Sequence, residues 1–397
     1  MDWAEHVDDD TEADLVRWRR HLHQSPELSF EEFETTEYVA GMLDRWGIPY
    51  DRPLRTGLVG HLRGKHPGPT VALRCDLDGL PIDEQNSFDF RSRTRGKMHA
   101  CGHDGHTAIL LGLARTLNGL RDEVRGEVRL LFQPAEEVLE SGARHLIDAG
   151  ALEGVDAVIG LHLISNIKTG VISLVEGPIL AAADVFEITV TGSGGHGGYP
   201  HETTDSLMIA AGLVGQLQTL VSRRVSPLEA AVVTVGTLHA GTAPNIIPGA
   251  ANLTGTVRTL SEKLRVKIER ELTGLVEHFA RAHGGSAEVK YMHGSPVLEN
   301  HRGLVEFLKP AAAAAVESNS VVDVAPEMGA EDFAYYSQVA PTAFALIGSG
   351  NKELESDFPH HHPRFTIDER ALGIGLRFML ESVERTSGSA SGLPAMK

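Results

Sequence analysis

The chain has 397 residues, and its 42% hydrophobic and 23% charged residues are typical of a soluble globular protein. This length exceeds one ordinary hydrophobic core, so we expect two domains. The formal net charge of −18 argues against nucleic acid or an anionic membrane as a partner, because both bind basic surfaces. An anionic small substrate would need a local positive group, such as a metal ion or an arginine.

The cysteine count and the N-terminus point to a reducing compartment. Cys75 and Cys101 are the only cysteines, too few for a disulfide framework at this length. The first residues, MDWAEHVDDDTEADL, are acidic and polar, unlike a signal peptide. No apolar run approaches the ~20 residues that cross a bilayer. We therefore expect a cytoplasmic protein with reduced thiols.

The N-terminal half alternates between helical and strand patterns. Helical spacing of apolar residues predicts helices over 11–24, with Thr11 as the cap, and within 26–48. Further along, strands are predicted over 57–64, 70–77, 126–133 and 156–163, and helices over 104–120 and 141–152. Strands separated by helices of this length indicate an α/β domain with a mostly parallel mixed sheet flanked by helices.

The pattern changes near residue 183. An alternating strand is followed by a helix, two strands, a long amphipathic helix and a final strand that ends near residue 294. This order is that of an α+β, ferredoxin-like unit, and we expect residues 181–293 to form an inserted domain. Residues 1–180 and 294–397 would then form the larger domain.

Five stretches gather acids, histidines or cysteine where a predicted strand ends or a loop begins. They are RCDLDGLP (74–81), MHACGHDGHT (98–107), FQPAEE (132–137), GLHL (160–163) and FPHHHPRF (358–365). Ligands collect at the carboxyl ends of strands in open α/β sheets, so these stretches can converge on one site.

Cys101 and His103 lie two residues apart in a glycine-flanked loop, where both can face one ion. Zinc, manganese and nickel accept mixed thiolate, imidazole and carboxylate ligands. A structural thiol beside an incidental histidine would give the same spacing. A cysteine nucleophile would also need a histidine base, and the sequence marks no particular one.

Paired acids follow two strands. Glu136 and Glu137 come after a strand and a proline, so one can bind metal while the other acts as a base. Asp76 and Asp78 end another strand and could bind metal or orient a ligand, although D-x-D-G also reads as a turn. His162 lies in an apolar strand, where a lone histidine is commonly a satisfied core residue.

Other polar candidates lie in loops. Among His360, His361 and His362, spacing cannot select a ligand. In the inserted domain, His196, His201, Asn245 and Arg258 could donate to a carbonyl oxygen or a carboxylate.

Seven ordered motifs, together with RRHLHQSPELSFEEFETT near the N-terminus, resemble those of a known family. They are HACGHDGHT, FQPAEE, GLH, GGHGGYPH, NIIP, EDFA (331–334) and H-x-P-x-F-x-x-D-E. The chain is similar, over about 15–380, to metal-dependent amidohydrolases of the aminoacylase/carboxypeptidase superfamily. The nearest branch contains hippurate hydrolase, N-acyl-amino-acid amidohydrolases and plant auxin-conjugate hydrolases.

The resemblance implies two divalent ions per subunit, of manganese, zinc, nickel or cobalt, with Cys101 bridging them. The remaining implied ligands are His103, Glu137, His162 and His361. His361 is selected because it precedes the family's phenylalanine by four positions, and the triple histidine leaves this choice open by one position.

The resemblance also implies roles around the metals. Glu136 would be the general base, Asp76 would orient a ligand, and His196 would polarise the substrate carbonyl across a dimer interface. Asn245 and Arg258 would contact substrate, and the inserted domain would serve as lid and dimerisation domain of a homodimer or a dimer of dimers. The chain departs from the family at VLESGA after Glu137, where a glycine-rich segment is usual.

The expected activity is hydrolysis of the amide bond of small N-acyl amino acids, which releases a carboxylic acid and a free amino acid. The nearest alternative is a dipeptidase or carboxypeptidase on the same scaffold. A binding protein that kept the fold would be expected to lack the base or a ligand, and every candidate position is filled. A cysteine-dependent enzyme would survive chelation but not thiol alkylation.

Overall fold

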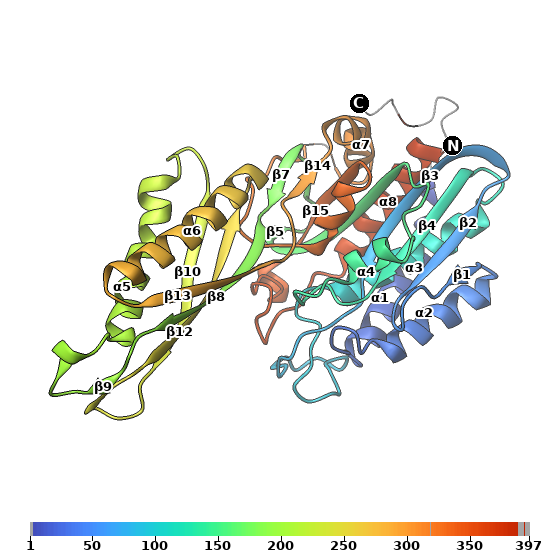
Figure 1. Cartoon of the computed structure of the whole chain (residues 1–397). Helices are drawn as coiled ribbons and strands as arrows, with labels where there is room; N and C mark the ends of the chain where they lie inside the picture. The colour runs from blue at the N-terminus through green and yellow to red at the C-terminus, as the bar shows by residue number, and fades with distance from the viewer. Residues whose placement is uncertain (1–2, 318, 388–392, 394–397) are drawn as a thin grey trace. The chain divides into compact units, whose positions relative to one another are not determined.

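The computed structural model describes residues 3–317, 319–387 and 393, and it divides the chain into two compact units (Figure 1). The first unit comprises Met1–Gly177, Glu299–Ala325 and Tyr335–Lys397. The second comprises Pro178–Leu298 and Pro326–Ala334.

The observed boundaries differ in detail from the predicted insertion of 181–293. The second unit begins at Pro178 and its main segment ends at Leu298. Residues 326–334, which were expected in the larger domain, group with the second unit. This segment runs along β7 (Gly177–Leu180) and its continuation, where Glu327 donates its N–H to the carbonyl of Ile179 at 3.0 Å. Such long-range backbone pairing leaves no periodic signal in a sequence.

The first unit is built on a seven-stranded sheet in the order β1-β2-β4-β3-β5-β15-β6. The four central strands are parallel: β4 (Arg125–Gln133), β3 (His66–Asp76), β5 (Ala157–Lys168) and β15 (Thr342–Gly350). The edge strands pair antiparallel: β1 (Tyr50–Asp51), β2 (Leu58–Arg63) and β6 (Ile172–Ser173). The mixed, centrally parallel sheet is therefore confirmed. All nine residues of β15 are buried, as expected for a central strand covered on both faces.

The helices of the first unit are α1 (Asp9–His23), α2 (Phe33–Trp46), α3 (His103–Gly119), α4 (Gly142–Asp148), α7 (Arg302–Ala314) and α8 (Arg370–Ser387). Short 3-10 turns occur at Trp3–His6, Asp332–Gln338 and Lys352–Leu354. The cap predicted for α1 is wrong by three residues. Asp8 is the N-cap, and its carboxylate accepts the N–H of Thr11 at 2.9 Å. An aspartate is as good a cap as a threonine, so the sequence alone did not decide between them.

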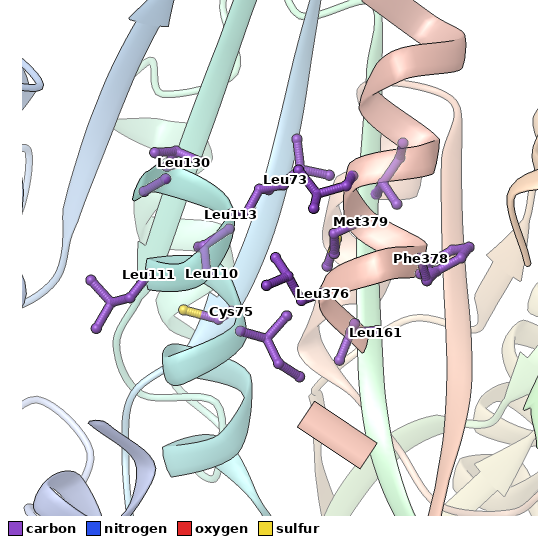
Figure 2. Close-up of a cluster of buried hydrophobic side chains, with 14 of the residues drawn as sticks. Leu73, Cys75, Leu110, Leu111, Leu113, Leu130, Leu161, Leu376, Phe378 and Met379 are labelled. Atoms are coloured by element: carbon purple, nitrogen blue, oxygen red, sulfur yellow. The ribbon is translucent and has the colours of Figure 1, made fainter. Parts of the chain in front are cut away.

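The core of the first unit lies where α3 and α8 pack against each other and against β3. Figure 2 shows leucines of α3 and α8 meeting over the sheet, with the Cys75 side chain lying toward α3. Burial raises the pKa of the Cys75 thiol well above its ordinary value. This cysteine is therefore an inert core residue.

The second unit has the predicted order of elements: β8 (Ala182–Thr191), α5 (Ser206–Thr219), β10 (Ala231–Ala240), β12 (Ala250–Thr259), α6 (Glu262–Ala282) and β13 (Ser286–His293). Its four strands pair antiparallel in the order β10-β12-β8-β13. Alternate residues of β8 are buried under the two helices, which is the pattern of a sheet with one covered face. At its end α5 passes into a π-helical turn at Leu220–Arg224.

Short strands complete the described structure: β9 (Gly195–His196) pairs with β11 (Ile246–Ile247), and β14 (Leu298–Asn300) pairs with β7. Among the described residues, no helix is long and apolar enough to cross a bilayer.

A buried ion pair holds the second unit together and gives a first prediction. Arg265 of α6 donates to both carboxylate oxygens of Asp184 in β8, at 2.6 and 2.9 Å, and Asp184 is 1% exposed. Replacing Asp184 by alanine removes the buried anion of this pair and leaves the guanidinium with the half-exposed carboxylate of Glu262, 3.2 Å away. We expect the second unit to lose about 3–5 kcal/mol of unfolding free energy, measured by urea denaturation with circular dichroism.

The control is Lys290→Ala, which breaks an exposed pair with Glu187 and should cost less than about 1 kcal/mol. Tryptophan fluorescence reports the first unit, because Trp3, Trp18 and Trp46 all lie there. A fluorescence transition that moved as far as the dichroism transition would contradict a stabilising role confined to the second unit.

Candidate metal and catalytic site

The predicted metal-site residues of the first unit meet at the carboxyl end of the parallel strands. Asp76 is the last residue of β3, and β4 ends three residues before Glu136. His162 lies within β5, and His103 is the first residue of α3. The structure brings these side chains together with those of Cys101, Glu137, His360 and His361.

Two of the groups formed by potential ligand atoms share Cys101. Cys101, His103 and Glu137 each offer a ligand atom within 4.8 Å of the others. Cys101, His162 and His360 form a second such group. A thiolate common to both groups suits a pair of divalent ions with sulfur between them.

Two buried polar atoms in the first group make no hydrogen bond within the described residues. The Nδ1–H of His103 donates to the carbonyl of Asp78 at 2.9 Å, while its buried Nε2 has no partner. Glu137 Oε1 is also buried without a hydrogen bond, 3.9 Å from that nitrogen. Buried polar atoms are normally satisfied, so these two fit the ligand set of a cation.

The electrostatic field of the site favours positive charge. Burial opposes protonation of His103, but the carboxylates of Asp76 and Asp78 outweigh it and raise the pKa of His103 to about 10. A divalent ion would take the place of that proton, so metal binding should be coupled to proton release.

The surroundings of His162 favour its neutral form, which is the form that can bind a metal ion. Burial, followed by repulsion from nearby imidazoles, lowers its pKa well below the ordinary value. Its Nδ1–H donates to the carbonyl of Leu163 at 3.0 Å, which leaves the Nε2 lone pair 3.5 Å from Cys101 Sγ. The tautomer is thus fixed by a backbone bond, as is common for metal-ligating histidines.

Asp76 is a buried anion beside the cluster. It accepts hydrogen bonds from Arg74 at 2.7 Å and from His106 at 2.6 Å, and it lies 3.6 Å from His103 Nε2. Burial opposes its ionisation, but His103 and Arg74 outweigh burial and hold the pKa of Asp76 well below its usual range. This geometry fits the predicted role of orienting a ligand.

Sequence reasoning assigned no role to several residues that fix the site. His106 lies one turn after His103 and uses both ring nitrogens, because Nδ1 bonds Asp76 and Nε2 accepts the N–H of Leu163. Asp104 anchors α3 to α1, since its Oδ2 meets Arg19 Nε at 2.8 Å. The HDGH spacing was the available signal for His106, because residues three apart share a helix face.

The structure narrows the choice of ligand among His360, His361 and His362 to two. His360 Nδ1 lies 3.7 Å from Cys101 Sγ, and its Nε2 accepts the N–H of Ser165 at 3.4 Å. His361 Nε2 lies 3.3 Å from Glu137 Oε1. The ring of His362 instead stacks on Phe358, with centroids 4.7 Å apart. Both His360 and His361 therefore reach the cluster.

In the second unit, His196 and Asn245 lie together and Arg258 lies apart. His196 in β9 pairs with β11, and the N–H of Gly197 donates to the carbonyl of Asn245 at 2.8 Å. Arg258 pairs with Ala183 at the start of β8, whereas His196 follows its end. The ten residues of β8 span roughly 30 Å, so Arg258 lies at the opposite end of this sheet.

Comparison with known proteins places the chain among metal-dependent hydrolases. Residues 72–385 match the sequence model of peptidase family M20/M25/M40. The chain is 42% identical to the N-acetyl-L-cysteine deacetylase of Bacillus subtilis (strain 168), over 94% of this chain and 88% of that protein. It is 38% identical to thermostable carboxypeptidase 2 of Saccharolobus solfataricus, over 94% of this chain and 96% of that protein.

A solved structure gives the same result. The Bacillus subtilis YXEP protein, described as a dinuclear metal binding peptidase from the M20 family, superimposes with a TM-score of 0.84. It is 35% identical in sequence, and the match covers 95% of this chain and 98% of that one.

The two histidines can be separated by metal analysis. His361 lies 3.3 Å from the Glu137 oxygen that makes no hydrogen bond among the described residues, whereas His360 already accepts a backbone N–H, so we expect His361→Ala to lose more metal than His360→Ala. Metal per subunit should fall by about one ion in His361→Ala. Inductively coupled plasma mass spectrometry after dialysis measures it.

His362→Ala is the matched control, because its ring stacks away from the cluster and its metal content should stay at the wild-type level. Equal losses in His360→Ala and His361→Ala would show that the last ligand is misassigned.

Proposed function

The chain belongs to peptidase family M20/M25/M40 and hydrolyses amide bonds, and from this premise we propose that its substrates are small N-acyl amino acids. Hydrolysis would release a carboxylic acid and the free amino acid. The observation that carries the proposal is the buried cluster in which Cys101 is common to two ligand groups. We propose that Cys101, His103, Glu137, His162 and His361 bind two divalent ions. His361 is next to the first group through Glu137 Oε1, 3.3 Å away, and His360, which belongs to the second group, is the alternative last ligand.

The bound ions would lower the pKa of water and polarise the scissile carbonyl. Glu136 is suited to the proton transfers, because it is 11% exposed and its Oε2 lies 4.0 Å from His103 Nε2. Its carboxylate would take a proton from the attacking water and deliver it to the leaving amine. Asp76 would orient the imidazoles that face the ions.

The substrate's carboxylate must bind to a chain of net charge −18. Arg258 is the proposed contact from the same chain. His196 and Asn245 lie at the opposite end of the second unit's sheet, so they would reach the substrate from the partner subunit, with His196 donating to the carbonyl oxygen. Burial lowers the pKa of Arg258, but an arginine stays protonated at any physiological pH and suits a carboxylate.

We propose that the second unit is a lid and dimerisation domain of a cytoplasmic homodimer or dimer of dimers. Apolar side chains exposed on α5 support this proposal: Leu207 is 41% and Met208 is 49% exposed. A second copy of the chain would cover them. Manganese, zinc, nickel and cobalt all accept the donor set.

A carboxypeptidase is the second candidate, because a relative with that name is 38% identical along nearly the whole chain. The substrate of a carboxypeptidase differs only in the group on the acyl side of the scissile bond, which is a peptide and not a simple acyl group. Neither candidate changes the roles proposed for the metal-site residues.

A substrate panel tests the proposal. We expect turnover of N-acetyl and N-benzoyl amino acids to exceed that of dipeptides and of benzyloxycarbonyl peptides, measured by release of free amino acid. EDTA should abolish turnover, and manganese or zinc should restore it. Faster cleavage of peptides would favour the carboxypeptidase, while activity that resists chelation would favour a cysteine-dependent enzyme.

Glu136→Gln tests the base. Glutamine keeps the shape of the side chain but cannot accept the proton, so kcat should fall by at least roughly a hundredfold while metal content stays at the wild-type value. Near-normal kcat in a metal-replete variant would refute the assignment.

Subunit mixing tests whether His196 acts across an interface. Inactive Glu136→Gln and His196→Ala chains should partly restore activity when co-assembled, because one site of the mixed dimer would have both groups intact. Lack of activity in purified mixed dimers would place His196 in the site of its own chain.

A further inference from the structure

Two buried carboxyl groups outside the ligand set hold the backbone of Ala135, Glu136 and Glu137, a segment named here the 135–137 loop. Asp78 follows β3, and Glu32 is the N-cap residue of α2. Asp78 is 1% exposed and Glu32 is fully buried. Neither position was singled out by the family motifs as a metal ligand or a base.

Asp78 uses its two oxygens separately. Oδ1 accepts the N–H of Glu136 at 3.1 Å, and Oδ2 accepts the N–H of Glu137 at 3.0 Å. Oδ2 also accepts the hydroxyl of Ser29 at 2.7 Å. The carboxylate therefore spans the two successive amides whose side chains are the proposed base and the proposed ligand.

Glu32 accepts two backbone hydrogen bonds with a single carboxylate oxygen. Its Oε1 accepts the N–H of Ala135 at 2.8 Å and the N–H of Phe30 at 2.9 Å. Both donors have left-handed backbone conformations, with φ of 54° for Ala135 and 63° for Phe30. Residues with a Cβ atom rarely adopt this conformation, so the surrounding bonds must hold it.

The turn at Ala135 directs the loop toward the cluster. Its carbonyl accepts the N–H of Gly142 at 2.9 Å, so both backbone polar groups of Ala135 are fixed. Gly142 packs so closely that a Cβ atom would lie 1.7 Å from the carbonyl oxygen of Pro134. The loop is thus clamped from α2, from the end of β3 and from the start of α4.

We propose that Glu32 and Asp78 are positioning residues, which fix the 135–137 loop so that adjacent glutamate side chains can serve as base and metal ligand. This inference rests on the proposed function for its catalytic consequence only. A base displaced by about 1 Å can lose a hundredfold in rate, so holding the backbone matters even though neither carboxyl touches the substrate.

Asp78 accepts loop hydrogen bonds with both carboxylate oxygens and Glu32 with only one. We therefore expect Asp78→Asn to loosen the loop and Glu32→Gln to leave it in place. In Asp78→Asn one carboxylate oxygen becomes an NH₂ group, which cannot accept an N–H, so one loop amide loses its partner. In Glu32→Gln the single accepting oxygen can be kept. Burial and the nearby Asp78 carboxylate raise the pKa of Glu32 to about 7, so an uncharged group suits this position.

The experiment measures hydrogen–deuterium exchange of the peptide that contains the 135–137 loop, together with kcat, KM and metal content. Asp78→Asn and Glu32→Ala should speed exchange and lower kcat about tenfold or more, with KM changed less than about threefold. Glu32→Gln should exchange like the wild type and keep most of its kcat. The exposed Glu34→Gln on α2 is the matched control for a charge change.

Folding is monitored by exchange of the peptide that contains β15, which should not change in any variant. The proposal is overturned if Asp78→Asn behaves like Glu34→Gln, if Glu32→Gln is as impaired as Glu32→Ala, or if only one of exchange and kcat responds. Should the wild type hydrolyse no N-acyl amino acid, the proposed function fails, and the exchange measurement still decides whether these carboxyls hold the loop.

Discussion

The site depends on one electrostatic constraint, namely that several buried carboxylates surround His103, of which Asp76 is paired with the buried guanidinium of Arg74. Asp76, Asp78 and Glu137 all approach this imidazole, which is 1% exposed. Taking such charges out of water is costly unless they are paired. The divalent cation proposed above would give these carboxylates a further positive partner. The same negative field that raises the pKa of the imidazole would favour the binding of a cation.

Hydrogen bonds from further buried residues fix the segments that carry the proposed ligands. Asp104, next to His103, is bound by Arg19 of α1, and His106 joins Asp76 to the backbone of β5. Asp78 bonds the loop that carries the paired glutamates. Each proposed ligand from α3 and from the 135–137 loop is therefore fixed by a second polar contact, as a preorganised metal site requires.

The fold explains why residues from five stretches of sequence can share one site. The parallel strands β3, β4 and β5 end at the same edge of the sheet, and the segments that follow them carry Asp78 and the paired glutamates. Helix α3 begins at this edge, so its first turn presents His103 and His106 to the strand ends. Ligand sites in open α/β sheets form at such edges.

The sequence by itself determined the elements, the central sheet and the stretches that carry the chemistry, because apolar periodicity and strand-end acids are local signals. It placed Cys101, His103, Glu137 and His162 in one cluster through ordered motifs. Only the tertiary structure decided that 326–334 joins the second unit and that Asp8 caps α1. It also showed that His360 and His361 face the cluster while His362 stacks on Phe358. It showed, too, that Glu32 and Asp78 both accept hydrogen bonds from the 135–137 loop. These are contacts between residues distant in sequence, or choices among chemically equal neighbours, and neither leaves a mark in local composition or spacing.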